Sequence, residues 1–393
     1  MRLRRLELVD FRSYDRVELE LEGGVTLFVG ANGQGKTNLL EAVQRVASGG
    51  SHRVAGDVPL VRHGCEAGVV RCVLETDEPR RRTIELEIGA GRRGRARVDG
   101  TDVRRASDAV GVLRTVLFAP EDVAIVRGDP EQRRRLLDDL LAQRRPAFAA
   151  ARAEYDRTLR QRNQLLRQLR GLGTQARGTA AATLDAWTDQ LVAHGTPLVA
   201  ARLAAIRALG DPVDRAYRQL ADRPDPITLR YRTTVQGSAA AMADDDRPVP
   251  EPGPIAEAFR EMLAEAASEE QARGTSLVGP HRDDVELAIG SLPARSHASH
   301  GETWSLALAL RLASFELLAE VGDRPVVLLD DVFAELDQGR RERLAAACAG
   351  FDQVLVTGAV EDDVPLDGGR VDVTLVDGTT CLSVRPAGTA GAA

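Results

Sequence analysis

The sequence predicts an α/β fold in which both ends of the chain build one domain and a helical arm is inserted between them. Three observations lead to this prediction. Apolar and polar residues alternate as in paired strands near the N-terminus, the apolar period becomes helical after Pro120, and strand and helix patterns alternate again from Ser276. The expected parts are a head from residues 1–119 and 275–388, a helical arm from residues 120–274, and a disordered tail from residues 389–393.

The first third reads as strands interrupted by one helix. LRRLELVDF, VELELEGG and VTLFVG have strand patterns within the first 30 residues, and Asn38 to Ala47 has helical spacing. A second strand-rich stretch covers Gly68 to Phe118, in which TIELEIGAG and RARVDG are typical of a hairpin. We expect these segments to supply strands of the head.

The middle third reads as a helical hairpin. Asp129-Pro130-Glu131-Gln132 carries the residues of a helix start, with Asp as the N-cap and Pro in the first turn. The helical pattern continues to Ala142, resumes after Pro146, is broken by GLGTQARG and then returns. GSAAAMADDDRPVPEPGP, residues 237–254, predicts a loop or flexible insert. Two such helices form an arm that is too short for a long coiled coil.

Composition places the chain among globular proteins of the cytoplasm. The 393 residues are 43% apolar and 28% charged, and no apolar run approaches the roughly 20 residues that span a bilayer. The four cysteines have no CxxC spacing, and the N-terminal segment reads as a strand rather than as a signal peptide. We therefore expect a cytoplasmic protein with no membrane partner.

Charge is distributed unevenly along the chain. The net charge is −7, yet residues 71–177 hold 24 arginines against 16 acidic residues. Such a region either forms a surface for polyanions or is a solvated helical surface in an arginine-rich protein. Charge alone does not separate the two readings.

Gly30 to Thr37 spells GANGQGKT and matches the G-x(4)-G-K-[ST] pattern of a phosphate-binding loop. It follows an apolar strand and opens a helix, which is the context that the pattern requires. Glycines let backbone N–H groups turn around a phosphate, Lys36 places a compact charge between the β- and γ-phosphates of ATP, and the Thr37 hydroxyl binds Mg²⁺. Lys36 is the only lysine in the chain, which fits a task that a planar guanidinium does badly. The predicted nucleotide contacts are Gly30, Ala31, Asn32, Gly33, Gln34, Gly35, Lys36, Thr37 and Asn38.

PVVLLDD, Pro325 to Asp331, reads as a buried apolar strand that ends in two carboxylates. Alone, the pattern fits a buried strand capped by solvated acids equally well. Together with the phosphate-binding loop it predicts a Walker B site, in which Asp330 holds Mg²⁺ through water and Asp331 orients or deprotonates the attacking water. We expect Lys36 and Asp331 to be the catalytic residues.

ASHGETWSLALALRL, which begins at Ala298, places a small-residue turn before an apolar helix. On its own this is the pattern of a serine-capped helix. Before a Walker B strand it resembles the L-S-G-G-Q signature of ABC-type ATPases, with Ser299, Gly301 and Glu302 at the turn. In that family the signature completes the nucleotide site of a second subunit, so the resemblance implies an ATP-dependent homodimer. Glu335-Leu336-Asp337 resembles the D-loop of such dimers, which implies that Asp337 lies between the two sites.

Four further segments resemble the RecF family among ABC- and SMC-type ATPases. They are FRSY from Phe11, PEDVAIVRGDPEQRRRLLD from Pro120, GPHRDD from Gly279 and LLDDVFAELDQGRRERL from Leu328. The resemblance implies a P-loop NTPase head of ABC/SMC type, in which Arg12 approaches the nucleotide. It also implies that ATP drives a homodimer that clamps double-stranded DNA at gaps. With RecO and RecR, that dimer would help load RecA onto DNA covered by single-strand-binding protein.

Three departures from ABC transporters predict slow hydrolysis. Pro120 stands where those proteins have a glutamine, and Thr357 ends the strand that would lead to a switch histidine. Asp331 is one methylene shorter than the usual glutamate. None of the three departures touches nucleotide binding. Whether the chain is chiefly an enzyme stays open, and we expect a weak DNA-dependent ATPase that acts mainly as an ATP-gated DNA-binding protein.

Arginines near the start of the arm are the predicted DNA contacts, namely Arg133, Arg134 and Arg135. They would bind phosphates without reading base sequence, or equally pair with Asp138 and Asp139 on the same helix. The segment His281-Arg282-Asp283-Asp284 reads as a structural or nucleotide-sensing loop rather than a metal site, because no further ligands lie at metal spacing.

The main alternative function is the soluble ATPase subunit of an ABC transporter. That reading predicts a glutamine loop and a switch histidine, but it predicts neither FRSY nor the long arm. An SMC-like structural protein would need far longer coiled coils. A nucleotide kinase or GTPase would leave the signature helix and the D-loop unexplained.

Overall fold

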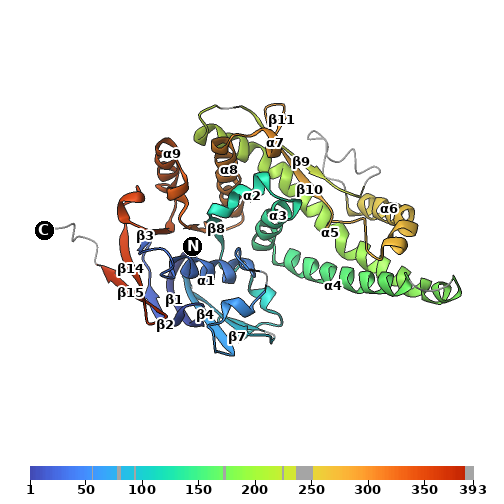
Figure 1. Ribbon diagram of the computed structural model, residues 1–393, viewed down its shortest axis with the longest axis horizontal. Helices are drawn as coiled ribbons and strands as arrows, with labels where there is room; N and C mark the ends of the chain where they lie inside the picture. Colours follow the sequence, from blue (N-terminus) through green and yellow to red (C-terminus); the bar gives the residue numbers. More distant parts are fainter. Residues whose placement is uncertain are drawn as a thin grey trace. The chain divides into compact units, whose positions relative to one another are not determined.

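The computed structural model describes residues 1–385 except 55, 78–80, 93, 171–173, 224 and 236–250 (Figure 1). The chain divides into two compact units. We call Met1–Val123, Pro212–Pro224 and Ser299–Ala393 the head unit, and Ala124–Asp211 and Asp225–Ala298 the arm unit. The functional boundaries expected at residues 120 and 275 stay a prediction, because compactness does not show which residues act together on a nucleotide. The expected tail, residues 389–393, lies outside the described residues.

Both chain ends build one six-stranded sheet of the head unit, as the sequence predicts (Figure 1). In spatial order it consists of β15 (Thr379–Arg385), β14 (Gly369–Val376), β3 (Gly24–Val29), β13 (Gln353–Gly358), β12 (Val326–Leu329) and β8 (Thr115–Phe118). The N-terminal strand β3 runs parallel to both of its neighbours, β13 and β14. Strands β8, β12 and β13 are buried at every residue, as parallel strands covered on both faces should be.

A second six-stranded sheet of the head unit is antiparallel. In spatial order it consists of β2 (Tyr14–Glu20), β1 (Arg2–Phe11), β4 (Ala67–Glu75), β5 (Arg81–Gly89), β6 (Arg95–Val98) and β7 (Thr101–Asp102). The predicted hairpin is confirmed, because β5 and β6 pair antiparallel with Leu86 opposite Ala96. Burial alternates along β4 and β5, which matches the period-2 pattern of their sequences.

Helix α1 (Lys36–Ser48) packs against strands of both sheets. Its side chains Leu39, Leu40, Val43 and Val46 belong to the main hydrophobic core, and their spacing is that of one helix face. This burial fixes the helix and therefore the glycine-rich loop that precedes it. The other long helices of the head unit are α8 (His300–Ala319) and α9 (Gln338–Cys348). Its short 3₁₀ helices are η1 (Val58–Leu60), η2 (Ala106–Ala109), η3 (Pro120–Asp122), η5 (Val332–Glu335) and η6 (Glu361–Asp363).

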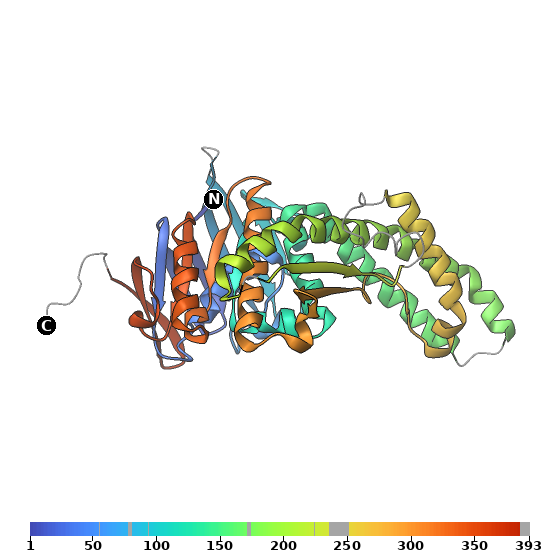
Figure 2. The same ribbon diagram turned by 90° about the horizontal axis from the view of Figure 1, so that it is seen from above.

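The arm unit is mainly helical. Its helices are α2 (Val123–Arg127), α3 (Pro130–Arg144), α4 (Pro146–Leu169), α5 (Thr174–Leu220), α6 (Pro252–Arg273) and α7 (Ala294–His297), of which α5 continues into the head unit. Helix α4, green in Figure 2, packs against α3 and against α6, which is yellow. Among the described residues, no helix is both long and apolar enough to cross a membrane.

The helix starts at Asp129 and Pro146 are confirmed, but two expectations change. Helix α5 begins at Thr174, inside the expected GLGTQARG break, because one internal glycine costs a helix only about 1 kcal/mol. Of the expected insert at 237–254, residues 237–250 lie outside the described part, and the segment from Pro252 begins α6.

A small antiparallel sheet in the arm unit was only partly foreseen. It consists of β11 (Leu292–Pro293), β10 (Asp284–Ile289) and β9 (Ile227–Arg232). Strand β9 has an alternating pattern, but its partner β10 lies beyond the whole of α6 in the sequence. Pairing across so long a connection cannot be read from local periodicity.

Candidate functional site

The glycine-rich loop joins β3 to α1 in the head unit and closes around the Lys36 ammonium. Gly33 and Gly35 have φ values of 81° and 105°, which side chains rarely allow. Lys36 is the first residue of α1 and is only 3% exposed. Its Nζ donates to the carbonyl oxygens of Gly30, at 2.7 Å, and Ala31, at 3.2 Å. The single lysine of the chain is thus buried within the loop that is predicted to bind phosphate, and the phosphate contact expected of it stays a prediction.

Both ends of the chain support this loop. From the start of β2, the Tyr14 hydroxyl donates to the Gly35 carbonyl at 3.1 Å. From the β14–β15 hairpin, Thr380 Oγ1 donates to the Gln34 carbonyl at 3.0 Å, and it lies 2.7 Å from Ser13 Oγ. A Cβ atom at Gly35 would lie 2.6 Å from Thr380 Oγ1. Glycine is therefore required there by the close approach as well as by φ.

The predicted Walker B carboxylate lies directly beside the start of α1. Asp330 follows β12, and its Oδ1 accepts hydrogen bonds from Thr37 Oγ1, at 2.9 Å, and from Thr357 Oγ1, at 2.8 Å. Burial raises the pKa of Asp330 to about 6, although both threonine hydrogen bonds act in the opposite direction. The Asp331 amide donates to Thr357 Oγ1 at 2.9 Å. Thr357, noted above as a departure, therefore connects the two carboxylate residues.

A buried carboxylate that sequence reasoning missed holds Arg12. Glu41 is completely buried on α1, and both of its oxygens accept from the Arg12 guanidinium, at 2.8 and 2.7 Å. Burial acts to raise the pKa of Glu41, but hydrogen bonds from Arg12 and Ser51 outweigh it and hold the pKa below its usual value. A glutamate among the apolar residues of α1 was the available signal. The nucleotide contact expected of Arg12 stays a prediction.

His52 is a second residue near the site that no sequence motif predicts. It lies in the segment after α1, and its Nε2 is 3.9 Å from Asp330 Oδ2. An imidazole thus lies beside the Walker B aspartate even though β13 supplies a threonine at the switch position. Nothing in the sequence around His52 could have indicated this proximity.

The signature turn forms a capping box at the start of α8. Ser299 Oγ accepts from the Glu302 amide at 3.3 Å, and the Glu302 carboxylate accepts from the Ser299 amide at 2.7 Å. These bonds from Ser299 hold the pKa of Glu302 below its usual value. Asp337 is the N-cap of α9, and its side chain accepts from the Arg340 amide at 3.0 Å. The local geometry is that of capped helices, so the roles expected across a dimer stay predictions.

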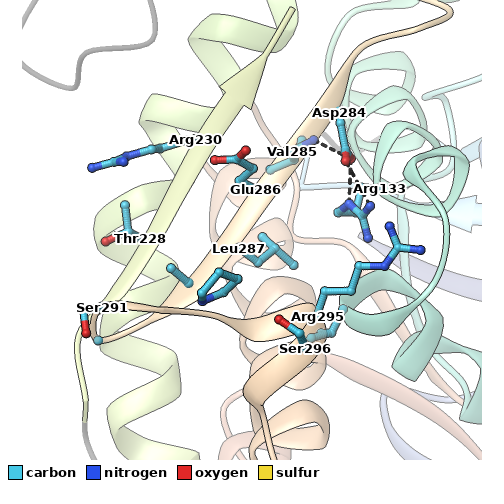
Figure 3. Close-up of a pocket in the computed structure, with 14 residues that line it drawn as sticks. Arg133, Thr228, Arg230, Asp284, Val285, Glu286, Leu287, Ser291, Arg295 and Ser296 are labelled. Carbon is cyan, nitrogen blue, oxygen red and sulfur yellow. Dashed lines mark hydrogen bonds and ion pairs between the residues drawn. The ribbon is translucent and has the colours of Figure 1, made fainter.

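The three arginines predicted to contact DNA differ in exposure. Arg133 is 4% exposed and forms a bidentate pair with Asp284, at 2.7 and 3.1 Å (Figure 3). Arg134 donates to the Asp283 carbonyl at 2.6 Å, and burial lowers its pKa. Arg135 pairs with Asp139 at 3.7 Å, and 37% of its side chain is exposed. Phosphate contact does not fit the engagement of Arg133 and Arg134 within the arm unit, whereas Arg135 remains a candidate.

A pocket of about 580 Å³ in the arm unit lies beside the Arg133–Asp284 pair (Figure 3). Leu287 and Arg230 line it from the small sheet, and Arg295 and Ser296 line it from α7. It contains no residue of the glycine-rich loop or of the Walker B strand.

The segment from Gly279 to Asp284 is tied into the arm unit. The His281 ring accepts at Nδ1 from the Tyr155 hydroxyl, at 2.7 Å, and its Nε2 lies 3.2 Å from the Ser276 carbonyl. Asp283 is buried and accepts from the Tyr231 hydroxyl at 2.7 Å. These contacts agree with a structural loop.

His281→Gln is expected to flatten the dependence of stability on pH between about 6.5 and 4. Burial lowers the pKa of His281 from 6.5 to about 4, so the unfolded chain takes up a proton in this window and the folded chain does not. Acidification through the window should therefore cost the wild type about 3 kcal/mol more than the variant. Urea denaturation at several pH values measures the difference. Parallel profiles for the two proteins would contradict the prediction.

The chain matches the family model described as "RecF/RecN/SMC N terminal domain" over residues 2–364. The DNA replication and repair protein RecF of Kineococcus radiotolerans is 51% identical over 377 residues, covering 93% of this chain and 94% of that protein. RecF of Streptomyces avermitilis is 49% identical over 378 residues, covering 95% and 98%.

Solved structures are similar over the same extent. The recombination mediator protein RecF-ATPrS of the RecFOR pathway superposes with a TM-score of 0.85 and 26% identity, covering 97% of this chain and 98% of that one. An Smc head bound to the C-terminal winged-helix domain of ScpA has a TM-score of 0.54 and 16% identity over 98% and 97% of the two chains. The second likeness concerns the fold alone, and it confirms the expected SMC-type head.

Proposed function

The chain belongs to the RecF family of DNA replication and repair proteins, and from this premise we propose that it is an ATP-gated DNA-binding protein of recombinational repair. The observation that carries the proposal is the meeting of Thr37 and Asp330, whose side chains lie 2.9 Å apart although 293 residues separate them. Lys36 is the first residue of α1, next to Thr37, and its ammonium lies in the glycine-rich loop. Together these residues form the two halves of a nucleoside triphosphate site.

The residues fit Mg²⁺ as well as ATP. A hydroxyl and a carboxylate are the hard oxygen ligands that this ion takes, and Thr37 and Asp330 would hold it. Burial raises the pKa of Asp330 to about 6, and a bound cation would act in the opposite direction by favouring the ionised carboxylate. When bound, Mg²⁺ would neutralise charge on the β- and γ-phosphates. Lys36 would bind those phosphates, backbone N–H groups from Gly33 to Asn38 would surround them, and Asp331 would orient water.

ATP is proposed to drive homodimerisation. Ser299 and Gly301 of one subunit would face the nucleotide of the other, with Asp337 between the two sites. Hydrolysis would be weak, because Asp331 is shorter than glutamate and Thr357 stands at the switch position. RecF-ATPrS, the similar structure, is described as a recombination mediator of the RecFOR pathway. This supports RecO and RecR as partners of the present chain and loading of RecA as the outcome.

The ATP-driven dimer would clamp double-stranded DNA at gaps through exposed arginines of the arm unit. Arg135 on α3 and Arg145 at the start of α4 present charge to solvent. Contacts of this kind go to phosphates, release counterions and carry no base specificity. The alternative, an ABC transporter subunit, predicts dimerisation by ATP without any affinity for DNA.

DNA binding should depend on ATP and weaken as salt rises. A gapped duplex is titrated with protein in ATP, in ADP or without nucleotide, between 50 and 200 mM salt, while mass photometry follows dimerisation. We expect dimers and tight binding with ATP, and at least about a tenfold loss of affinity across the salt range. ADP is the matched control, because it retains the nucleoside and two phosphates. Dimers that ignore DNA at every salt concentration would overturn the repair assignment.

A further inference from the structure

Arg340 of α9 lies against the signature turn at the start of α8. Its Nε donates to the buried Ser305 Oγ at 3.0 Å, and its Nη1 donates to Asp337 of the D-loop. A Cβ atom at Gly301 would lie 2.6 Å from Arg340 Nη2, so the glycine leaves space for the guanidinium. One side chain thus contacts both of the segments that are proposed to face a second subunit.

The end of the long helix α5 is fastened to the same place. Asp222, two residues beyond α5, accepts from Arg340 Nη2 at 3.0 Å and from Arg343 Nη2 at 2.7 Å. Arg343 Nη1 donates to the carbonyl of Leu220, the last residue of α5, at 2.5 Å. A cation at a helix C-terminus also interacts favourably with the helix dipole. All of these residues belong to the head unit.

Electrostatics make Arg340 dependent on Asp222. A guanidinium beside the N-terminus of α8 is disfavoured by the dipole of that helix, so nearby carboxylates must offset it. Asp222 and Asp337 do so. The hydrogen bond from Arg343 holds the pKa of Asp222 below its usual value, and the hydrogen bond from the Arg340 amide does the same for Asp337. Without the Asp222 charge, Arg340 would keep Asp337 as its remaining carboxylate partner. Of the bonds described above, only that from Arg343 to the Leu220 carbonyl would then tie the D-loop and the signature turn to the end of α5.

We propose that Asp222 is a positioning residue for the ATP site that forms between two subunits. Acting through Arg340 and Arg343, it holds the signature turn and the D-loop in a fixed position relative to the C-terminal end of α5. Helix α5 is continuous into the arm unit, so this link couples ATP-driven pairing to a DNA-bound arm. Coupling of this kind is reciprocal, since DNA must then favour pairing as much as pairing favours DNA. The inference rests on the function proposed above.

Asp222→Asn tests the proposal, with Asp214→Asn as the matched control. Asp214 also lies near the end of α5, and its carboxylate accepts from Arg218 Nε of the same helix at 2.9 Å. Three quantities are measured for each protein: ATP affinity of the monomer, the dimer dissociation constant in ATP, and the ratio of that constant without and with gapped DNA. For Asp222→Asn we expect unchanged ATP affinity, a dimer about tenfold weaker and a ratio close to one. Asp222→Glu should restore part of the ratio.

The outcomes separate this inference from the function on which it rests. Wild-type dimerisation that DNA strengthens, together with the same ratio in Asp222→Asn, would overturn the role of Asp222 alone. If the wild type forms no ATP-dependent dimer, the proposed function fails and the inference fails with it. Asp222 is 62% exposed, so the variant should fold, and an unchanged thermal transition checks this. If Asp222 had only a structural role, Asp222→Asn would lower the temperature of the thermal transition and leave the ratio of the dimer dissociation constants unchanged. That result would also contradict the proposal.

Discussion

Lys36→Ala is expected to lower the affinity for ATP on the order of 100-fold and to remove ATP-dependent DNA binding. Lys36 is 3% exposed, and its ammonium lies in the glycine-rich loop, where we propose that it binds two phosphates. A hydrogen bond to a charged group contributes about 1.5–3 kcal/mol, and each 1.4 kcal/mol is a factor of ten in affinity. Titration with a fluorescent ATP analogue measures the loss directly.

Lys36→Arg is the sharper control for the same site. It keeps the positive charge but replaces a compact ammonium by a planar fork, which the buried position cannot accept without moving the carbonyls of Gly30 and Ala31. We expect Lys36→Arg to bind ATP nearly as weakly as Lys36→Ala. Retention of ATP-dependent DNA binding by the arginine variant would mean that charge alone suffices. The shape of the loop would then not explain why the chain has a lysine at this position.

The sequence predicts the core of this site because its signals are local. A glycine-rich loop between an apolar strand and a helix, and a buried strand that ends in carboxylates, each depend on a short run of residues. Parallel strands place their carboxyl ends at one edge, which is why Thr37 and Asp330 meet. Glu41 and His52 depend instead on which distant side chain lies opposite. Periodicity cannot supply that information.

The arginine run at the start of α3 shows that local sequence can indicate which residue is buried but cannot identify its distant partner. Three consecutive arginines read as a charged surface, yet a helix turns each of them to a different side. Arg133 shares a face with Leu137 and Leu140, at spacings of four and seven, and is buried with them. Its spacing was a usable signal of burial. Its partner Asp284 lies on a strand that only the tertiary fold brings close.

Asp138→Ala is expected to destabilise the arm unit by about 3–5 kcal/mol, because it leaves a buried arginine without its carboxylate. Asp138 on α3 is 2% exposed, and its two oxygens accept from Arg202 on α5, both at 2.8 Å. Arg202 is 4% exposed, and it also donates to the Pro280 carbonyl at 2.6 Å. Asp139 on the same helix is the matched control. Its ion pair with Arg135 is partly exposed, so Asp139→Ala should cost less than about 1 kcal/mol.

The two tryptophans allow the measurement to be assigned to one unit. Trp187 lies on α5 in the arm unit and Trp304 on α8 in the head unit, so urea denaturation in a Trp304→Phe background follows the arm. Replacing both charges, Asp138→Leu with Arg202→Met, should recover most of the lost stability, because neither member of the buried pair is then left without the other. A double variant as unstable as Asp138→Ala would contradict this explanation. The stability lost by the double variant would then come from the hydrogen bonds that Arg202 makes to Pro280 and Tyr231. The arm unit would depend on those hydrogen bonds rather than on the pairing of the Arg202 charge.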